Sequence, residues 1–169
     1  MRYLLDTNII AEPTKLEANL NVMNTLTLYS GEVAISAVSW HELWFGTDRL
    51  PPSRKRTTLE TYLTNLANTG IPILPYTQEA GKWFATERSR LTSLGQTPAY
   101  ADGQIASIAY VNNLILATRN TSDFIPFDGL NLENWFDQKG DGGRAKGEFK
   151  RRSDLLSLNC IYVDFSDSS

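Results

Sequence analysis

The chain has 169 residues, 41% of them hydrophobic, and a formal net charge of −3, which suits one domain with its own core. Its one cysteine and one histidine exclude an internal disulfide and cysteine-cluster or multi-histidine metal sites, and they argue against a histidine-dependent nucleophilic triad. No apolar run reaches membrane-spanning length, and the N-terminal stretch is too short and carries Asp6, so we predict neither a membrane helix nor a signal peptide and expect a cytoplasmic protein.

Charge is distributed unevenly along the chain. Residues 138–152 carry six Lys or Arg and two Asp or Glu, a net charge of +4, whereas the rest carries 10 and 17, a net charge of −7. A Gly-rich, basic composition is typical of solvated tails. We therefore predict a folded domain over residues 1–137 and a basic extension, partly disordered, over residues 138–169. Its residues 154–164 suit a short added element whose type the sequence does not define.

Strand and helix patterns alternate through the first 95 residues. We predict strands at residues 2–5, 32–36 and 71–76. The third contains two prolines, which favour the edge of a sheet. We predict a helix after Pro13 in the segment 9–29, on the periodic pattern of residues 16–26, and further helices at about residues 37–47, 53–68 and 78–94. Ser36 is placed to cap the second of these helices.

The stretch from Pro98 onward contains a further helix and strand. Asp102, Ile105, Ala106 and Ala109 recur at the spacing of one helix face. We predict that this helix ends near residues 112–113 and is followed by strands at residues 114–118 and 130–135. The alternation of strands and helices predicts an α/β domain with a mainly parallel sheet.

Four acidic residues take related positions in this order of elements. Asp6 and Asp123 follow strands, Glu42 lies in the helix after the second strand, and Asp102 lies in a first helical turn. Right-handed crossovers bring such positions to one rim of the sheet. Crowded carboxylates repel one another unless a cation compensates, and oxygen ligands favour Mg²⁺ or Mn²⁺, which activate water for attack on a phosphodiester. The alternatives are that Asp102 only complements the helix dipole and that Glu42 is an ordinary exposed residue.

At these positions the sequence resembles the PIN-domain ribonucleases, and among them the VapC-type toxins of type II toxin–antitoxin pairs. The resemblance covers residues 1–137 and rests on four motifs in order, LLDTNII at 4–10, ISAVSWHELWFG at 35–46, YADGQIASIA at 100–109 and LILATRNTSDF at 114–124. It implies a PIN-like three-layer α/β/α fold. It also implies catalytic roles for a quartet of acids: Asp6, Glu42, Asp102 and Asp123. Three of them, Asp6, Asp102 and Asp123, are the implied metal ligands.

The resemblance also assigns supporting residues and partners. Thr7 and Asn8 match residues that support the first acid, and Thr118 and Asn120 match positions around the fourth. Members of the family cleave RNA with Mg²⁺ or Mn²⁺, usually dimerise and are silenced by a cognate antitoxin that covers the site. The remaining candidate, Arg119, either pairs with a substrate phosphate or is a surface residue. The helix with Trp40 and Trp44 offers either a dimer surface or ordinary core.

Three other functions fit the pattern less well. A haloacid-dehalogenase-like phosphatase needs a second Asp two residues after the first, where Asn8 stands. A phosphosignalling receiver domain needs adjacent acids near the first strands and a late lysine, and neither is present. A catalytically silent PIN-fold RNA-binding protein keeps the fold without catalysis, but the four acids are intact. The sequence therefore favours a metal-dependent endoribonuclease.

Overall fold

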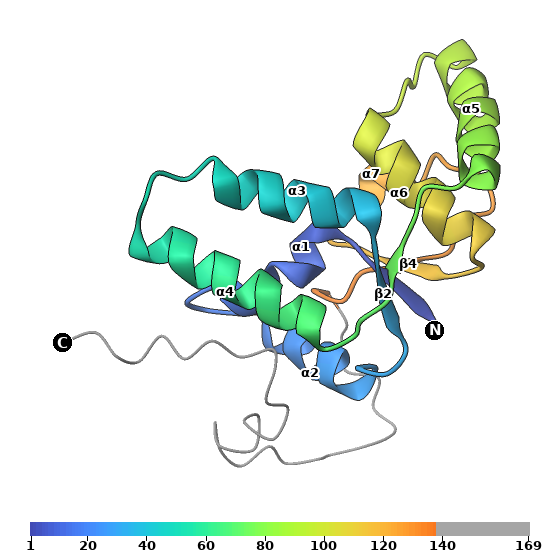
Figure 1. Cartoon of the computed structure of the whole chain (residues 1–169). Coiled ribbons are helices and arrows are strands. Elements are labelled where there is room, and N and C mark those ends of the chain that lie inside the picture. The colour runs from blue at the N-terminus through green and yellow to red at the C-terminus, as the bar shows by residue number, and fades with distance from the viewer. Residues whose placement is uncertain (138–169) are drawn as a thin grey trace.

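A five-stranded parallel sheet forms the centre of the molecule, whose computed structural model describes residues 1–137 (Figure 1). The strands are β1 Tyr3–Leu5, β2 Val33–Ser36, β3 Ile73–Leu74, β4 Ile115–Ala117 and β5 Leu132–Glu133. Their order is β3-β2-β1-β4-β5, and every neighbouring pair is parallel. The predicted strands are therefore all present, although each is shorter than predicted. The edge position predicted for the third strand is confirmed.

Helices connect the strands in the expected alternation. They are α1 Thr7–Ile10, α2 Leu20–Leu28, α3 Ala37–Asp48, α4 Arg54–Asn68, α5 Gln78–Ser93, α6 Tyr100–Val111 and α7 Thr121–Phe124, with a 3-10 turn at Glu12–Thr14. The helix predicted after Pro13 is present as α2, but it begins at Leu20 rather than near Leu16. Pro13 lies in the 3-10 turn that follows α1, and the Asn19 side chain accepts bonds from two backbone amides to begin α2 afresh. The predicted extension, including residues 154–164, lies outside the described residues.

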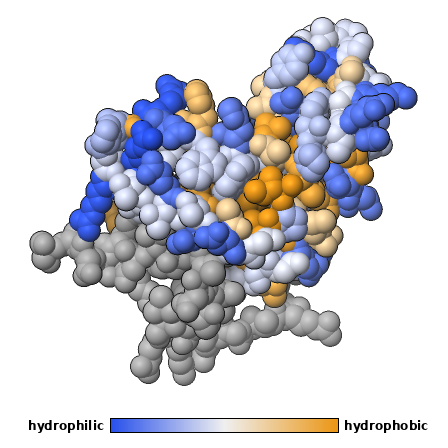
Figure 2. Space-filling model, in the orientation of Figure 1, coloured by the Kyte–Doolittle hydropathy of each residue, from blue (hydrophilic) through white to orange (hydrophobic). Residues whose placement is uncertain are grey.

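Two apolar clusters cover the two faces of the sheet and make three layers. Because successive strand residues point to opposite faces, Tyr3 and Leu5 pack with α1, α2 and α4, whereas Leu4 packs with α5 and α6. Figure 2 shows apolar residues gathered at the middle of the visible face and hydrophilic residues over the outer parts of the helices. The predicted three-layer α/β/α architecture is confirmed. None of the helices within residues 1–137 combines the length and the apolarity that a membrane span requires.

The α3 helix begins at the carboxyl end of β2, where the Ser36 hydroxyl accepts the Ser39 amide as predicted. The rings of Trp40 and Trp44 pack edge to face, 6.0 Å apart, against the core beneath α2 and α4. Both rings are partly buried against the core, and dimerisation stays a prediction. Phe45 is the most exposed of the large apolar side chains of α3, at 55%.

Candidate active site

Asp6 stands at the junction of β1 and α1 and is almost fully buried. One carboxylate oxygen accepts the Thr7 amide at 2.7 Å, and the other accepts the Asn8 amide group and the Thr118 hydroxyl, each at 2.7 Å. Burial raises the pKa of Asp6, the three donors oppose that rise, and the nearby charge of Asp123 adds to it. The carboxylate is therefore fixed in position and short of compensating positive charge.

Thr118 follows β4 and connects the first acid to the loop after that strand. Its hydroxyl donates to Asp6 and accepts from the Asn8 side chain at 3.3 Å and from the Asn120 amide at 3.0 Å. Thr118 was expected around the fourth acid, and its side chain bonds to the first, while Asn120 connects it to the Asp123 amide. The cause is strand register: Leu5 and Ala117 are paired across β1 and β4, so the residues that follow them are neighbours.

Glu42 reaches the same rim from the second turn of α3. Its Oε2 accepts the Thr7 hydroxyl at 2.8 Å, so Thr7 joins two acids, through its amide to Asp6 and through its side chain to Glu42. The sequence alone leaves the role of Glu42 open. This contact holds its carboxylate near the end of β1. Oε1 of Glu42 accepts no hydrogen bond from the described residues.

Asp102 lies in the first turn of α6, and Asp123 lies in α7 rather than directly at the end of β4. Desolvation raises the pKa of Asp102, and the charges of Asp6, Asp123 and Glu42 raise it further. That mutual effect identifies the four predicted acids as electrostatic neighbours. No Lys or Arg of residues 1–137 forms a salt bridge with any of them. Their negative charge is left without an ion-pair partner among the described residues.

The donor set fits a hard divalent cation by its chemistry. All four side chains offer oxygen, which Mg²⁺ and Mn²⁺ prefer, and a cation would relieve the repulsion that raises the pKa of Asp102. As the side chains stand, however, no three His, Cys, Asp or Glu residues among residues 1–137 are grouped closely enough to hold a metal ion. The case for a cation therefore rests on donor type and charge and not on a preformed cage.

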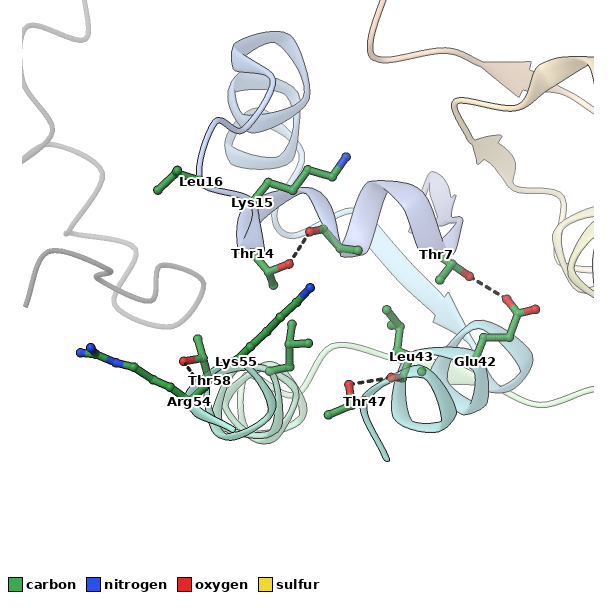
Figure 3. Close-up of a pocket in the computed structure, with 13 residues that line it drawn as sticks. Thr7, Thr14, Lys15, Leu16, Glu42, Leu43, Thr47, Arg54, Lys55 and Thr58 are labelled. Atoms are coloured by element: carbon green, nitrogen blue, oxygen red, sulfur yellow. Dashed lines mark hydrogen bonds between the residues drawn. The ribbon is translucent and has the colours of Figure 1, made fainter. Parts of the chain in front are cut away.

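A groove of about 820 Å³ opens beside Glu42 and runs between α1, the 3-10 turn, α3 and α4 (Figure 3). Thr7 and Glu42 lie at one end and are joined by their hydrogen bond. Lys15 and Lys55 extend from the other end, where Lys55 reaches from α4 toward Thr14. The sequence did not predict this groove, because its walls come from four segments whose packing no local pattern describes.

Arg119 and Asn120 take positions beside the acids. The Arg119 amide donates to the Asn8 side chain at 3.0 Å, and its guanidinium carbon lies 5.2 Å from the centre of the Phe136 ring. The side chain thus packs on an aromatic ring, and no contact with the acid cluster is found among the described residues. Asn120 contributes its backbone amide to Thr118. Of the supporting residues, Thr7, Asn8 and Thr118 touch the acids directly.

Replacing Thr118 with Val is expected to lower RNA cleavage by about 10-fold, since outer residues that orient ligands typically contribute 10- to 100-fold. The substitution removes a donor that opposes the rise in the pKa of Asp6, so the carboxylate should require a higher pH to ionise. The acidic limb of the rate profile should therefore shift to higher pH. Thr118→Ser, which keeps the hydroxyl, is the matched control. A Val variant with the parent's rate and profile would contradict this role.

Comparison with known proteins places these features in a family. A family model described as "PIN domain" matches residues 3–128. The chain is 34% identical to Toxin FitB of Neisseria gonorrhoeae, covering 79% of this chain and 99% of that protein. It is 29% identical to VapC ribonuclease Y4jK of Sinorhizobium fredii, covering 77% and 93%. The fold is similar to a chain of the FitAcB crystal structure from N. gonorrhoeae, with a TM-score of 0.73, 32% identity and coverage of 80% and 99%.

Proposed function

The chain belongs to the PIN-domain family and to its VapC- and FitB-like toxins, and we propose that it is a metal-dependent endoribonuclease that acts as the toxin of a toxin–antitoxin pair. The observation that carries the proposal is the group of four mutually repelling carboxylates, Asp6, Glu42, Asp102 and Asp123, at one rim of the sheet. The family membership and the name ribonuclease carried by the S. fredii relative support RNA as the substrate.

The contacts of the four acids indicate a separate role for each in binding the cation or accepting a proton. Asp6 is oriented by three donors, and Asp102 and Asp123 supply the further oxygens that would hold Mg²⁺ or Mn²⁺ with it. The bound cation would lower the pKa of a coordinated water and offset charge on the phosphodiester. Glu42 is held by Thr7 through Oε2, so its Oε1 is available to accept the proton of the attacking water. Protonation of any of these carboxylates would weaken the site.

The antitoxin is the proposed protein partner. The groove beside Glu42 offers an apolar floor that includes Leu43 and Leu59, with cationic side chains at its outer end. A partner segment lying there would block access to the acids from one side. Affinity capture with the chain from its native host should recover a small protein whose addition stops cleavage. Recovery of no such protein would count against the toxin–antitoxin assignment while leaving the nuclease proposal intact.

The test of the enzymatic proposal is cleavage of total RNA by the purified protein. Discrete fragments should form with Mg²⁺ or Mn²⁺ and disappear when a chelator is added, because only the bound cation would lower the pKa of the attacking water and offset charge on the phosphodiester. Asp102→Asn protein purified in the same way controls for contaminating nucleases. Cleavage that persists with chelator, or that the variant retains, would overturn the assignment. Fragments obtained from the parent would then be mapped to define the target.

A further inference from the structure

A second cavity, of about 740 Å³, lies between α5 and the start of α6. Two tyrosines stand at it with exposed rings, Tyr76 at 38% and Tyr100 at 61%. The guanidinium carbon of Arg88 lies 3.9 Å from the centre of the Tyr100 ring. Arg88 forms no ion pair with a carboxylate of the described residues. The cavity therefore presents the Tyr76 ring and the planar guanidinium of Arg88 stacked on Tyr100, with a positive charge that no acid of the described residues pairs with.

The rings are held from behind by the packing of α5 and α6. Phe84, which is buried, meets Tyr100 edge to face with ring centres 5.8 Å apart. A Cβ added at Gly81 would lie 3.5 Å from the Tyr76 hydroxyl, so the Tyr76 ring rests directly on the α5 backbone. Because both rings lie against fixed neighbours, little conformational freedom remains to be lost when a planar ligand stacks on them.

Hydroxyl groups complete the wall of the cavity. They belong to Ser89, Thr92, Ser93 and Thr97. Thr97 donates to Thr92 at 3.1 Å, which leaves hydroxyl acceptor sites directed at solvent or ligand. Aromatic faces, a guanidinium and several adaptable hydroxyls form the combination that takes an unstacked nucleobase, by stacking on its plane and by hydrogen bonding to its edge.

The cavity is next to the acidic cluster without sharing its residues. Tyr100 and Asp102 occupy the same first turn of α6, about 3 Å apart along the axis and about 200° apart around it. Tyr100 thus faces α5, whereas Asp102 faces the other acids. A single strand that passes around the start of α6 would place one base in the cavity and a phosphodiester a few nucleotides further along at the acids.

We propose that the Tyr76–Arg88–Tyr100 cavity binds one unstacked base of single-stranded RNA a few nucleotides from the bond that is cleaved. For its ligand the inference rests on the proposed ribonuclease function. Stacking tolerates all four bases because each has a π face. The cavity therefore contributes affinity for single-stranded segments and excludes duplex RNA, whose bases are not free to enter.

The test measures binding in the absence of divalent cations, so that cleavage plays no part. A short fluorescein-labelled oligoadenylate and a matching abasic ribose-phosphate chain are titrated with the full chain and followed by fluorescence anisotropy. Tyr100→Ala is expected to weaken oligoadenylate binding by about 10-fold and to leave binding of the abasic chain unchanged. Tyr100→Phe should bind like the parent. Tyr110→Ala, which removes a partly exposed tyrosine near the other end of α6, should do so too.

Equal oligoadenylate affinity for Tyr100→Ala and the parent would overturn the proposal, as would an equal loss for the abasic chain. Sedimentation equilibrium of each variant adds a second criterion, because a changed molar mass for Tyr100→Ala would identify this face as a protein interface instead. A parent protein that binds through Tyr100 but never cleaves would keep the inference and overturn the nuclease proposal. A parent that cleaves RNA, together with a Tyr100→Ala variant that binds oligoadenylate as tightly as the parent, would keep the nuclease proposal and overturn this inference.

Discussion

Asp102→Asn protein is expected to lose RNA cleavage by at least about 100-fold and yet to unfold at a higher temperature than the parent when no divalent cation is present. Asp102 accepts no hydrogen bond from the described residues, and its charge is disfavoured by burial and by three neighbouring acids. Asn has the same shape without the charge, so it removes the repulsion and the cation ligand together. The same substitution at Asp6 is less clean, because an amide nitrogen there would face donors from Asn8 and Thr118.

The stability gain of this variant should depend on pH in one direction. The pKa of Asp102 is raised in the folded chain above the value of about 3.9 of an unperturbed Asp. Between the unfolded-state pKa and the higher folded-state pKa, the folded chain therefore binds more protons than the unfolded chain. The parent loses stability as the pH rises through this range. Below the unfolded value both states are protonated, and the parent and the variant should converge. Near neutral pH we expect a gain of about 1 kcal/mol, or roughly 3 °C.

Thermal unfolding in the presence of a chelator, at acidic and at neutral pH, measures this difference. Circular dichroism of the folded variant establishes that lost cleavage does not reflect a lost fold. A variant that is less stable than the parent at neutral pH would show that the charge of Asp102 is satisfied in the native protein. Unchanged cleavage would show instead that Asp102 takes no part in the chemistry.

Gly103→Ala is expected to destabilise the fold by about 3 kcal/mol, the upper end of the usual cost of overpacking. An added Cβ would lie 1.8 Å from Cε2 and 2.1 Å from Cζ of Phe84. The Phe84 ring has little room to move, because it is buried and packs against the rings of Tyr100 and Phe127. The helices α5 and α6 would have to separate, and Asp102 would move with the first turn of α6.

The matched control is the same substitution at Gly46, in the last turn of α3. No neighbouring atom lies within 4 Å of a Cβ added there. The free energy of unfolding should therefore change only through the higher helix propensity of alanine, which adds about 0.5–1 kcal/mol. Denaturant unfolding should thus give effects of opposite sign for the two variants. A Gly103→Ala protein as stable as the parent would mean that α5 and α6 do not approach as closely as the structure has them.

Local sequence patterns predicted the elements well because their signals are local. Ser36 caps α3, Pro98 precedes α6, and the short apolar runs that end in acids are strands. The four acids could be named because each stands beside such a signal or within a family motif. The start of α2 was predicted too early, because the apolar spacing continues backward from Leu20 to Leu16 and obscures the cap at Asn19.

Contacts between distant segments were beyond what local patterns predict. The bond from Thr118 to Asp6 depends on β4 lying beside β1, and strand order is decided by packing over the whole chain. The approach of Phe84 to Gly103 depends on the separation of two helices. Tyr76 and Tyr100 meet at one cavity for the same reason. The sequence identified the chemical groups, and tertiary packing determined which of them act together.

The measurement that tests the central claim most directly is calorimetric titration of the cation-free chain with Mn²⁺, in parallel with Asp102→Asn protein. If the acids form the cation site, the parent should bind Mn²⁺ saturably and release protons near the raised pKa of Asp102, and the variant should show binding weakened at least about 10-fold. Equal binding by both proteins, or none by the folded parent, would contradict the assignment of the four carboxylates as the metal site of a nuclease.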